Sequence, residues 1–274
     1  MKILYVTDLH GRIAAYEKTF ERALDADVRA IVNGGDLYPL GSDLFEVQEQ
    51  FISGYLSKYL EHCAQAGLDF LCTLGNMDLR GLDSEFIRVM DSVPNAHCLL
   101  DEMVEFEGYS FIGSPMTVDG PFALKDRCLR DTKHSTDPPV GGRALVSDSN
   151  GLHQVDDWGK TLAELPSLSQ HLACLPRPPD PHRAVYVLHQ PPFGADLGMI
   201  SKTVDVGSQA VREFLAERKG LLSLHGHIHE SPFVGGRWRI KLGETTCVQP
   251  GQLMGKDCVS VVIDLENLEM DRSC

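Results

Sequence analysis

The sequence predicts an α/β fold in which largely parallel strands alternate with helices, and two observations support this prediction. First, several short, continuous apolar runs end in polar turns that contain glycine or proline, as buried strands often do. These runs are KILYV, RAIV, LDFLCTL, AVYVL and LLSL. Second, segments with apolar residues at helical spacing lie between the runs. This alternation is typical of a parallel sheet with helices packed on its faces.

Three segments have the helical pattern. In residues 13–24 and 51–63, one apolar residue recurs at each turn, which predicts helices with one face packed on a sheet. The residues on these faces are Ile13, Tyr16, Phe20 and Leu24 in the first segment and Phe51, Tyr55, Tyr59 and Cys63 in the second. The third segment, SQAVREFLAERKG, ends in lysine and glycine, a common helix stop.

The remaining strand signals have a different pattern. The segments MVEFEGYSFIG and FVGGRWRIKLG predict hairpins, and CVSVVIDLENL predicts a closing strand near the end of the chain. The alternating apolar residues of that strand are Val259, Val261, Ile263 and Leu265. Since hairpins add antiparallel strands, we expect mixed sheets rather than purely parallel ones.

The 274 residues are predicted to form a single domain, residues 1–274, with an irregular insertion at about residues 115–183. The insertion contains the turn-forming sequences DPP, GG, SDSNG and PRPPDP, and one helical stretch from Thr161 to Leu172. A long irregular segment of this kind is often a lid or a wall of a substrate site. A surface excursion without a role in the site fits the sequence equally well.

Composition narrows the class of protein. The hydrophobic content of 43% and the charged content of 23% are those of an ordinary folded protein. The net charge of −14 argues against an extended nucleic-acid surface. The eight cysteines are scattered and include no CxxC pair, as expected in a reducing compartment. No apolar run is long enough for a signal-peptide core or a membrane span, so a soluble cytoplasmic protein is expected.

Side chains that can bind metals follow five of the strand-like runs. In chain order they are Asp8 and His10, then Asp36, Asn76 and His189, and finally His227 and His229. Because ligands gather beyond the carboxyl ends of strands in α/β sheets, these side chains are expected to share one crevice. The oxygen and imidazole donors suit two divalent cations such as Mn²⁺, Fe²⁺, Zn²⁺ or Ni²⁺. A bridging carboxylate can hold two such ions roughly 3.5–4 Å apart.

Five motifs in these turns carry a resemblance to a known family. In order along the chain they are DLHG, GGD, GNMD, LHQPP and GHIH, and the series resembles that of the calcineurin-like metallophosphoesterases. The resemblance runs from Asp8 to His229 and leaves out the irregular middle of the chain. It implies an α/β fold built as a four-layer sandwich of two mixed β-sheets flanked by helices. The small prokaryotic phosphodiesterase-like branch of the family is the most similar.

The resemblance also implies a role for each donor. The implied ligands are Asp8, His10 and His229 for the first metal ion, Asp36 as the bridge, and Asn76, His189 and His227 for the second ion. Two divalent ions are therefore the expected cofactors, with Mn²⁺ preferred over Fe²⁺, Zn²⁺ and Ni²⁺. The implied catalytic residues are Asn76, Asp78, His189 and His10. His225 lies outside the motif and is expected either to support a ligand from behind or to be a packing residue.

One position departs from the family pattern. Many members have the sequence GNH followed by an acidic residue, whereas this chain has Met77 followed by Asp78. The histidine of those members assists the departing oxygen, and a thioether cannot donate a proton. Some small prokaryotic phosphodiesterases of the family also lack the histidine, so Met77 does not imply an inactive protein.

The function implied by the resemblance is hydrolysis of phosphate esters, with small phosphodiesters as the expected substrates. A hydroxide that bridges two metal ions would attack phosphorus in line, and the cations would stabilise the developing charge. Diesters are favoured because missing leaving-group assistance matters least for an acidic leaving group. A small substrate such as a nucleotide suits a chain with 39 Asp and Glu residues better than a large anionic polymer does.

Two other functions stay open at this point. Within the enzyme class, the alternative is a phosphomonoesterase, including a protein serine/threonine phosphatase. Outside it, the alternative is a non-catalytic scaffold that has kept the fold and serves as a binding module. Such scaffolds typically lose several ligands, whereas all seven donors are present here. The sequence leaves the physiological substrate and the oligomeric state open.

Overall fold

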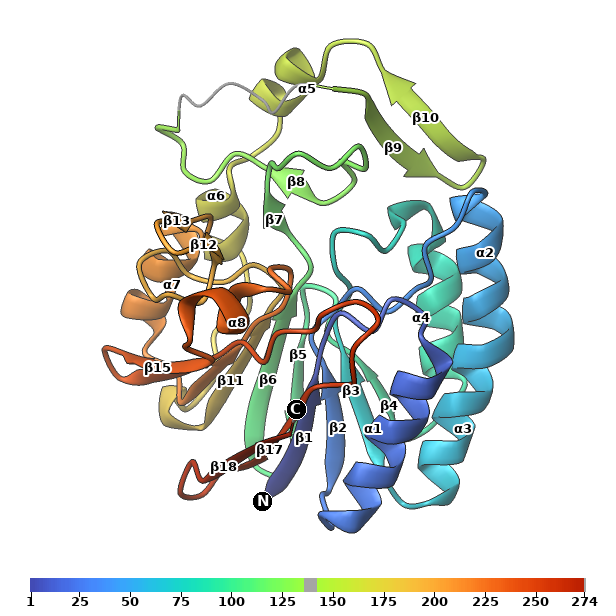
Figure 1. The fold of residues 1–274 in the computed structure, drawn as a ribbon, viewed down its shortest axis with the longest axis vertical. Helices are drawn as coiled ribbons and strands as arrows, with labels where there is room; N and C mark the ends of the chain where they lie inside the picture. Colours follow the sequence, from blue (N-terminus) through green and yellow to red (C-terminus); the bar gives the residue numbers. More distant parts are fainter. Residues whose placement is uncertain (136–141, 274) are drawn as a thin grey trace.

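The strand-like runs form two six-stranded sheets that pack against each other (Figure 1). The computed structural model describes residues 1–135 and 142–273. The first sheet has the order β18 (Met270–Ser273), β17 (Ser260–Asp264), β1 (Lys2–Val6), β2 (Ala30–Asn33), β3 (Asp69–Cys72) and β4 (Ala96–Cys98). The second has the order β15 (Arg239–Leu242), β16 (Thr245–Val248), β14 (Leu222–Leu224), β11 (Ala184–Leu188), β6 (Tyr109–Ser114) and β5 (Met103–Phe106).

Parallel strands form the larger part of each sheet. In the first sheet β1 to β4 are parallel, with Leu4 beside Ile31 and Ile31 beside Phe70. In the second sheet β6, β11, β14 and β16 are parallel. Antiparallel strands extend the sheets, where β17 pairs with β1, β5 with β6 and β15 with β16. The prediction of mixed sheets is confirmed, and the carboxyl ends of the parallel strands point to the upper end of the molecule in Figure 1.

Alternate residues of the parallel strands enter different hydrophobic cores. In β1, Tyr5 packs between the two sheets, whereas Leu4 packs on the outer face of its sheet. In β11, Val187 packs between the sheets and Tyr186 packs on the other side. A strand that is buried on both faces needs apolar side chains at successive positions. This double burial explains why the strands appear in the sequence as continuous apolar runs.

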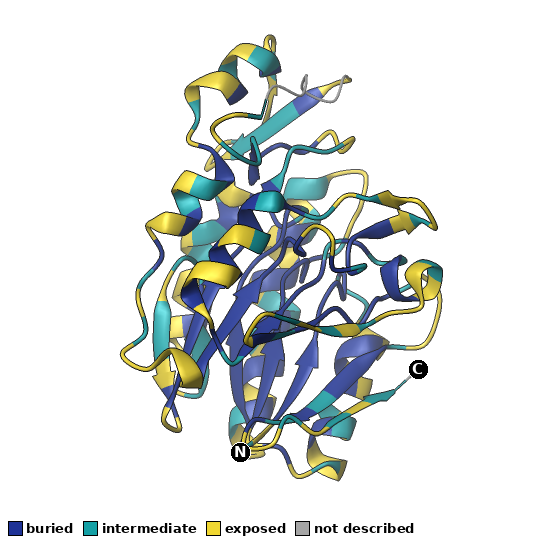
Figure 2. Ribbon diagram, turned by 90° about the vertical axis from the view of Figure 1, so that its left-hand side faces the viewer, coloured by how far each residue is buried: buried dark blue, intermediate teal, exposed yellow. Residues whose placement is uncertain are grey.

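Helices cover the outer face of each sheet. On the first sheet they are α1 (Ile13–Asp25), α2 (Leu44–Gln50), the π-helix η1 (Phe51–Leu56), α3 (Ser57–Gln65) and α4 (Asp83–Asp91), and on the second α6 (Leu168–Ala173) and α7 (Gln209–Arg218). Tyr16 and Phe86 share a core with Ile31 of β2, and Phe214 packs on Tyr186 of β11. Buried strands therefore lie between partly exposed helices (Figure 2). The predicted four-layer sandwich is confirmed.

The predicted helices are present, and the buried face of the first is rotated from the expected one. In α1, Ile13 and Leu24 are 48% and 47% exposed, whereas Ala15, Tyr16 and Thr19 are buried. The buried face combines small side chains with the ring of Tyr16. The segment predicted at 51–63 falls in η1 and α3, and α7 ends at Arg218, with Lys219 as its C-cap, close to the predicted stop.

The two predicted hairpins have different outcomes. The first is confirmed, since β5 and β6 pair antiparallel. The second prediction is wrong in its first half, where Ser231–Gly235 forms the short helix α8. Pro232 fits the first turn of a helix and Gly236 ends it in the left-handed conformation. The hairpin itself joins β15 to β16, so only Arg239–Leu242 of the predicted segment is a strand.

The segment 115–183 is more regular than the sequence predicts. It contains β7 (Thr117–Val118), β8 (Cys128–Leu129), β9 (Ala144–Asp148), β10 (Gly151–Val155), α5 (Trp158–Glu164), α6 and the 3-10 turn η3 (Pro181–Arg183). β9 and β10 form an antiparallel hairpin around SDSNG. The single predicted helical stretch is two helices, because Pro166 interrupts it and Ser167 caps α6. The sequence DPP and the first glycine of GG lie outside the described residues.

Hydrogen bonds attach the insertion to the loop that follows β3. The Asp126 carboxylate accepts the N–H groups of Arg80 (2.9 Å) and Ser147 (2.6 Å). The Ser147 hydroxyl in turn accepts the N–H of Gly81 at 2.8 Å. Arg80 and Gly81 belong to the 3-10 turn η2 (Arg80–Leu82). The hairpin β9–β10 is therefore fixed to the body of the fold at the upper end in Figure 1.

A second short hairpin, β12 (Met199–Ser201) with β13 (Val204–Asp205), completes the elements. Among the helices in residues 1–135 and 142–273, none combines the length and the apolar character that crossing a bilayer requires.

Candidate metal centre

The seven predicted donors occupy the loops that follow five strands. Asp8 and His10 follow β1, Asp36 follows β2 and Asn76 follows β3, all in the first sheet. His189 follows β11, and His227 and His229 follow β14, in the second sheet. Side chains from the two sheets contact one another, as His189 does with Asp36 and His227 does with Asn76. The donors therefore meet where the carboxyl ends of the two sheets come together.

The first donor cluster consists of Asp8, His10, Asp36 and His229. One ligand atom of each residue lies within 4.8 Å of those of the other three. The Nε2 atoms of His10 and His229 are 3.2 Å apart, and His229 Nε2 is 3.5 Å from Asp8 Oδ1. The side chains of Asp8, His10 and Asp36 are almost completely buried, while His229 keeps 24% of its side-chain surface exposed. Solvent therefore reaches this cluster on the His229 side.

The second donor cluster consists of Asn76, His189 and His227. The Asn76 Oδ1 atom is 3.2 Å from His189 Nε2 and 2.7 Å from His227 Nδ1. Asp36 lies between this cluster and the first, because its Oδ2 atom is 3.5 Å from Nε2 of both His10 and His189. The structure thus brings all seven predicted donors together.

Four of the donors have a backbone conformation that is rare outside glycine. Their φ angles are 57° at Asp8, 46° at His10, 52° at Asp36 and 69° at His227. Backbone hydrogen bonds hold the loops in place, from the Asp8 N–H to Gly35 O and from the His10 N–H to Asp36 O, both at 2.9 Å. Residues in the left-handed region cost free energy and cluster at functional sites. The surrounding contacts therefore keep the donors converging even where the local backbone does not favour it.

Two glycines lie so close to the donors that there is no room for a Cβ atom at either position. A Cβ at Gly75 would lie 2.3 Å from Asp36 Oδ1 and 2.7 Å from His189 Cε1. A Cβ at Gly226 would lie 2.2 Å from Thr7 Oγ1 and 2.9 Å from Asp8 Oδ2. These distances are below van der Waals contact, so any other residue would displace a donor.

Gly226→Ala is therefore expected to weaken metal binding by at least about 10-fold, the size of effect seen when the support of a ligand is lost. Gly54→Ala is the matched control, because a Cβ at Gly54 meets nothing within 4 Å. Isothermal titration with Mn²⁺, together with circular dichroism, measures affinity and fold in both variants. Equal Mn²⁺ affinity in the two variants would contradict the prediction.

The residues present fit a divalent cation. Asp8 Oδ2 and Asn76 Nδ2 are buried and have no hydrogen-bond partner among the described residues. The His10 and His229 nitrogens face each other at 3.2 Å, an arrangement in which at most one of two neutral rings can donate. Buried polar atoms without partners are costly, and a cation bound by the lone pairs removes that cost. Mixed nitrogen and oxygen donors of this kind suit a first-row divalent metal.

The profile of the calcineurin-like phosphoesterases matches residues 1–231. The chain belongs to this family. The match covers all seven donors and most of the two sheets, so the resemblance carried by the five motifs is confirmed. Members of the family are phosphoric ester hydrolases, and membership implies two divalent metal ions.

Solved structures support the calcineurin-like fold. The crystal structure of TT1561 of Thermus thermophilus has a TM-score of 0.59 at 17% identity, and the alignment covers 99% of this chain and 97% of that one. A dimetal phosphatase from Danio rerio has a TM-score of 0.53 at 10% identity, with 95% and 92% covered. At these identities the likeness concerns the fold alone. The comparison with curated proteins gave no match.

Burial and neighbouring charges shift the pKa values of the donors in this calcineurin-like centre. Burial would raise the pKa of Asp36, but the neighbouring His189 and His10 lower it well below the usual range. Burial would lower the pKa of His189, but Asp36 raises it to about 9. Burial and repulsion from His189 lower the pKa of His227 to about 3. An ionised Asp36 and a neutral His227 are the forms that bind metal.

The Asp78 carboxylate has a position that the sequence does not reveal. It is fully buried and accepts the N–H groups of Leu37 (3.1 Å), Tyr38 (2.9 Å) and Gly75 (2.9 Å). Burial and repulsion from Asp36 raise its pKa to about 7, against the effect of these hydrogen bonds. Its contacts therefore connect the loop after β2 with the loop after β3.

His225 is a packed residue beside the centre, one of the two roles expected for it. Its side chain is fully buried, and Nδ1 donates to the carbonyls of Leu188 and Gln190, each at 3.0 Å. Burial lowers its pKa to about 4, so the ring is neutral. Sequence reasoning missed Gln249, whose side-chain amide donates to the carbonyls of Gly226 and Ile228 and holds the last loop. A single glutamine in a turn carries no sequence signal for this contact.

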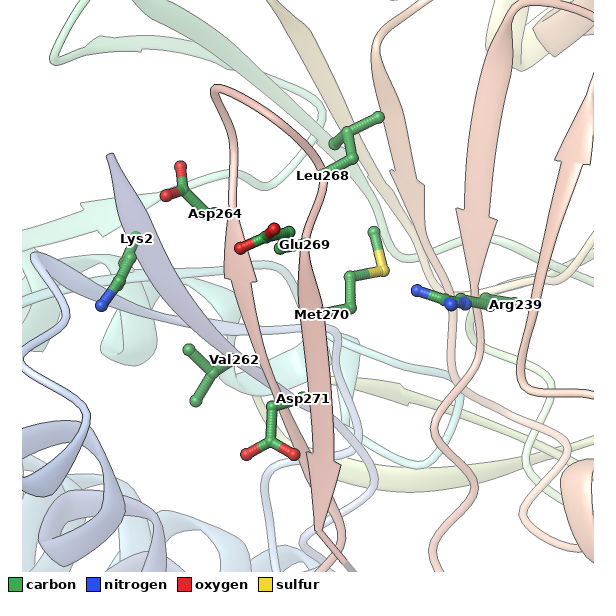
Figure 3. A pocket seen from close by; sticks show the side chains of 8 residues that line it. All are labelled: Lys2, Arg239, Val262, Asp264, Leu268, Glu269, Met270 and Asp271. Carbon is green, nitrogen blue, oxygen red and sulfur yellow. The ribbon is translucent and has the colours of Figure 1, made fainter.

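A surface hollow of about 640 Å³ lies elsewhere, beside the β17–β18 hairpin (Figure 3). Its lining includes Lys2, Arg239, Asp264 and Met270, none of which is a predicted donor. Lys2 is at the start of β1, whereas Asp8 follows the end of that strand. None of the predicted donors lines this hollow, so it is separate from the metal centre.

Proposed function

We propose that this protein is a dinuclear-metal phosphodiesterase that hydrolyses small phosphate diesters. The observation that supports it most directly is the position of Asp36, with Oδ2 3.5 Å from a nitrogen of His10 and from a nitrogen of His189. A carboxylate oxygen between two sets of donors is the arrangement that a bridging ligand requires.

Each donor cluster would hold one divalent ion. The proposed ligands are Asp8, His10 and His229 for the first ion, Asn76, His189 and His227 for the second, and Asp36 for both. Mn²⁺ is the proposed metal, with Fe²⁺, Zn²⁺ and Ni²⁺ as alternatives that the same donors would accept. The bound ions would supply an activated water and positive charge at the phosphoryl oxygens.

The side chains of the centre would orient the ester and stabilise its charge. The Asn76 amide nitrogen is buried without a partner among the described residues, so it can donate to a phosphoryl oxygen. His189 would hold the second ion through Nε2, because its Nδ1 already donates to the carbonyl of Gly34 at 2.8 Å. His10 would bind the first ion and help to position it beside the ester. Asp78 is better described as a positioning residue, because its carboxylate fixes the backbone of both loops.

Met77 favours diesters over monoesters as substrates. It occupies the position where many family members have the histidine that assists the leaving group, and its side chain cannot donate a proton. Such a centre acts best on an ester with a good leaving group. A phosphomonoesterase is the alternative within the family, and a non-catalytic scaffold is the alternative outside catalysis. The complete set of donors argues against the scaffold.

A reducing compartment, such as the cytoplasm, is proposed as the location. The seven cysteines in the described part of the chain are free thiols, and four of them are buried. Burial raises the pKa of Cys63 to about 12, which keeps it as an unreactive thiol.

Removal of metal tests the proposed function. EDTA followed by dialysis is expected to abolish hydrolysis of bis(p-nitrophenyl) phosphate and to lower Tm by about 5 °C or more, since ions at 100 times Kd contribute about 2.7 kcal/mol. Two equivalents of Mn²⁺ should restore both. The same assay with p-nitrophenyl phosphate separates the alternatives, because a faster monoester would identify a phosphomonoesterase. No hydrolysis of either ester by protein with two bound Mn²⁺ ions would support the scaffold.

A further inference from the structure

An aromatic side chain of the insertion lies beside the metal centre. The ring of Phe122 packs against the ring of His227, with centroids 5.7 Å apart and the planes at 60°. His227 belongs to the second donor cluster, and its Nδ1 is 2.7 Å from Asn76 Oδ1, so Phe122 contacts that cluster directly. Phe122 is nevertheless 39% exposed. Part of its ring is therefore free to contact a molecule bound at the centre.

The turn that carries Phe122 is fixed at both ends. Before it, the Asp119 N–H donates to the carbonyl of Leu129 at 2.9 Å, and after it, the Leu145 N–H donates to the carbonyl of Ala123 at 2.8 Å. Proline at the preceding position restricts the backbone further. The ring thus keeps its place with little cost in conformational entropy when a ligand binds.

A buried lysine forms hydrogen bonds that hold the same turn. Lys125 is 3% exposed, and its Nζ donates to Asp119 Oδ1 and to the carbonyl of Gly120, both at 2.7 Å. Nζ also lies 5.7 Å from the ring of Trp158. Exposed apolar residues are common and by themselves indicate nothing. Phe122 differs from them because a rigid turn holds it against a residue of the metal centre.

We propose that Phe122 is the aromatic wall of the substrate site and selects phosphate esters that carry a flat ring, such as a phenyl group or a nucleobase. The inference rests on the proposed function, since it requires a phosphoryl group at the donor clusters. A substituent of that phosphoryl group on the His227 side lies against Phe122. Contacts between aromatic rings are worth roughly 2- to 12-fold in affinity.

Equilibrium binding of two phosphonates tests the proposal without any turnover. Phenylphosphonate and methylphosphonate carry the same anionic group and differ only in the substituent. We expect the wild-type protein loaded with Mn²⁺ to bind the phenyl compound about 10-fold more tightly, measured by isothermal titration. Phe122→Ala should bind methylphosphonate as the wild type does and lose most of the preference for phenyl. Phe122→Leu should also lose most of the preference for phenyl, because leucine keeps the apolar bulk but has no aromatic ring.

Phe233→Ala is the matched control. Phe233 is 47% exposed, and the guanidinium of Arg272 lies 5.4 Å from the centroid of its ring. This variant should keep the wild-type preference. An unchanged preference in Phe122→Ala overturns the proposal, and so does a parallel loss of affinity for both phosphonates, which would make Phe122 a support for His227. If the wild type binds both phosphonates equally, only the aromatic wall fails. If it binds neither with Mn²⁺ present, the proposed function fails as well.

Discussion

Asp36→Asn is expected to lower kcat/KM for phosphoester hydrolysis by at least about 100-fold and to reduce the metal content below two ions per chain. The amide lacks the charge that two cations require from a bridging ligand, although its oxygen can still accept the N–H of Met77, which lies 2.8 Å from Asp36 Oδ1. Asparagine also tolerates the left-handed backbone of this position, where φ is 52°. The fold should therefore persist, as measured by circular dichroism.

Asp27→Asn is a close control for that substitution. Asp27 has almost the same backbone conformation, with φ at 51°, and lies exposed after α1. It should leave activity and metal content unchanged. Atomic emission spectroscopy on both purified variants gives the stoichiometry. Two bound ions and full activity in Asp36→Asn would rule out the bridging role.

Met77→His is expected to change the dependence of the rate on the leaving group. In the wild-type protein an aryl diester should be cleaved far faster than a dialkyl diester, because no residue at position 77 protonates the departing oxygen. A general acid is typically worth roughly 10²- to 10⁴-fold, so the variant should recover at least about 10-fold for the dialkyl ester and change the aryl ester little. The position is suitable, since Met77 is partly exposed and its N–H contacts Asp36.

Met77→Leu is the control for that experiment, because it changes the side chain without adding a proton donor. Both kcat/KM values should stay near those of the wild type. Asp78→Asn is a poor control, since the Asp78 carboxylate accepts three backbone N–H groups and its loss would loosen both loops. Equal rates for the two esters in the wild-type protein would show that another group already supplies the proton.

The donors could be predicted because each one directly follows a strand. A continuous apolar run such as KILYV marks a strand buried on both faces, and in parallel strands the residues after such runs meet at one end of the sheet. Asp36 and Asn76, which follow the neighbouring parallel strands β2 and β3, are therefore linked by topology before any contact is known. The order of the five motifs indicates the family, and the profile match confirms it.

Contacts that depend on distant segments could not be predicted in this way. The position of Phe122 beside His227 requires the path of the whole insertion, and the three hydrogen bonds of Asp78 require the relative placement of two loops. The hairpin β9–β10 is a different case. Ser149 and Asn150 connect its strands, and Gly151, with φ at 119°, follows them. The sequence Asn–Gly is a hairpin signal that the prediction of an irregular insertion overlooks.

The large separation in sequence between facing donors has a consequence for folding kinetics. His10 and His229 are 219 residues apart, and Asn76 and His227 are 151 apart, yet each pair is in contact. Contacts between such distant residues form only after long loops close, which is slow and occurs late. Ions that bind the completed donor set therefore stabilise the native state more than the folding transition state. We infer that they slow unfolding and leave the early folding rate unchanged, so that the metals give the chain kinetic rather than only thermodynamic stability.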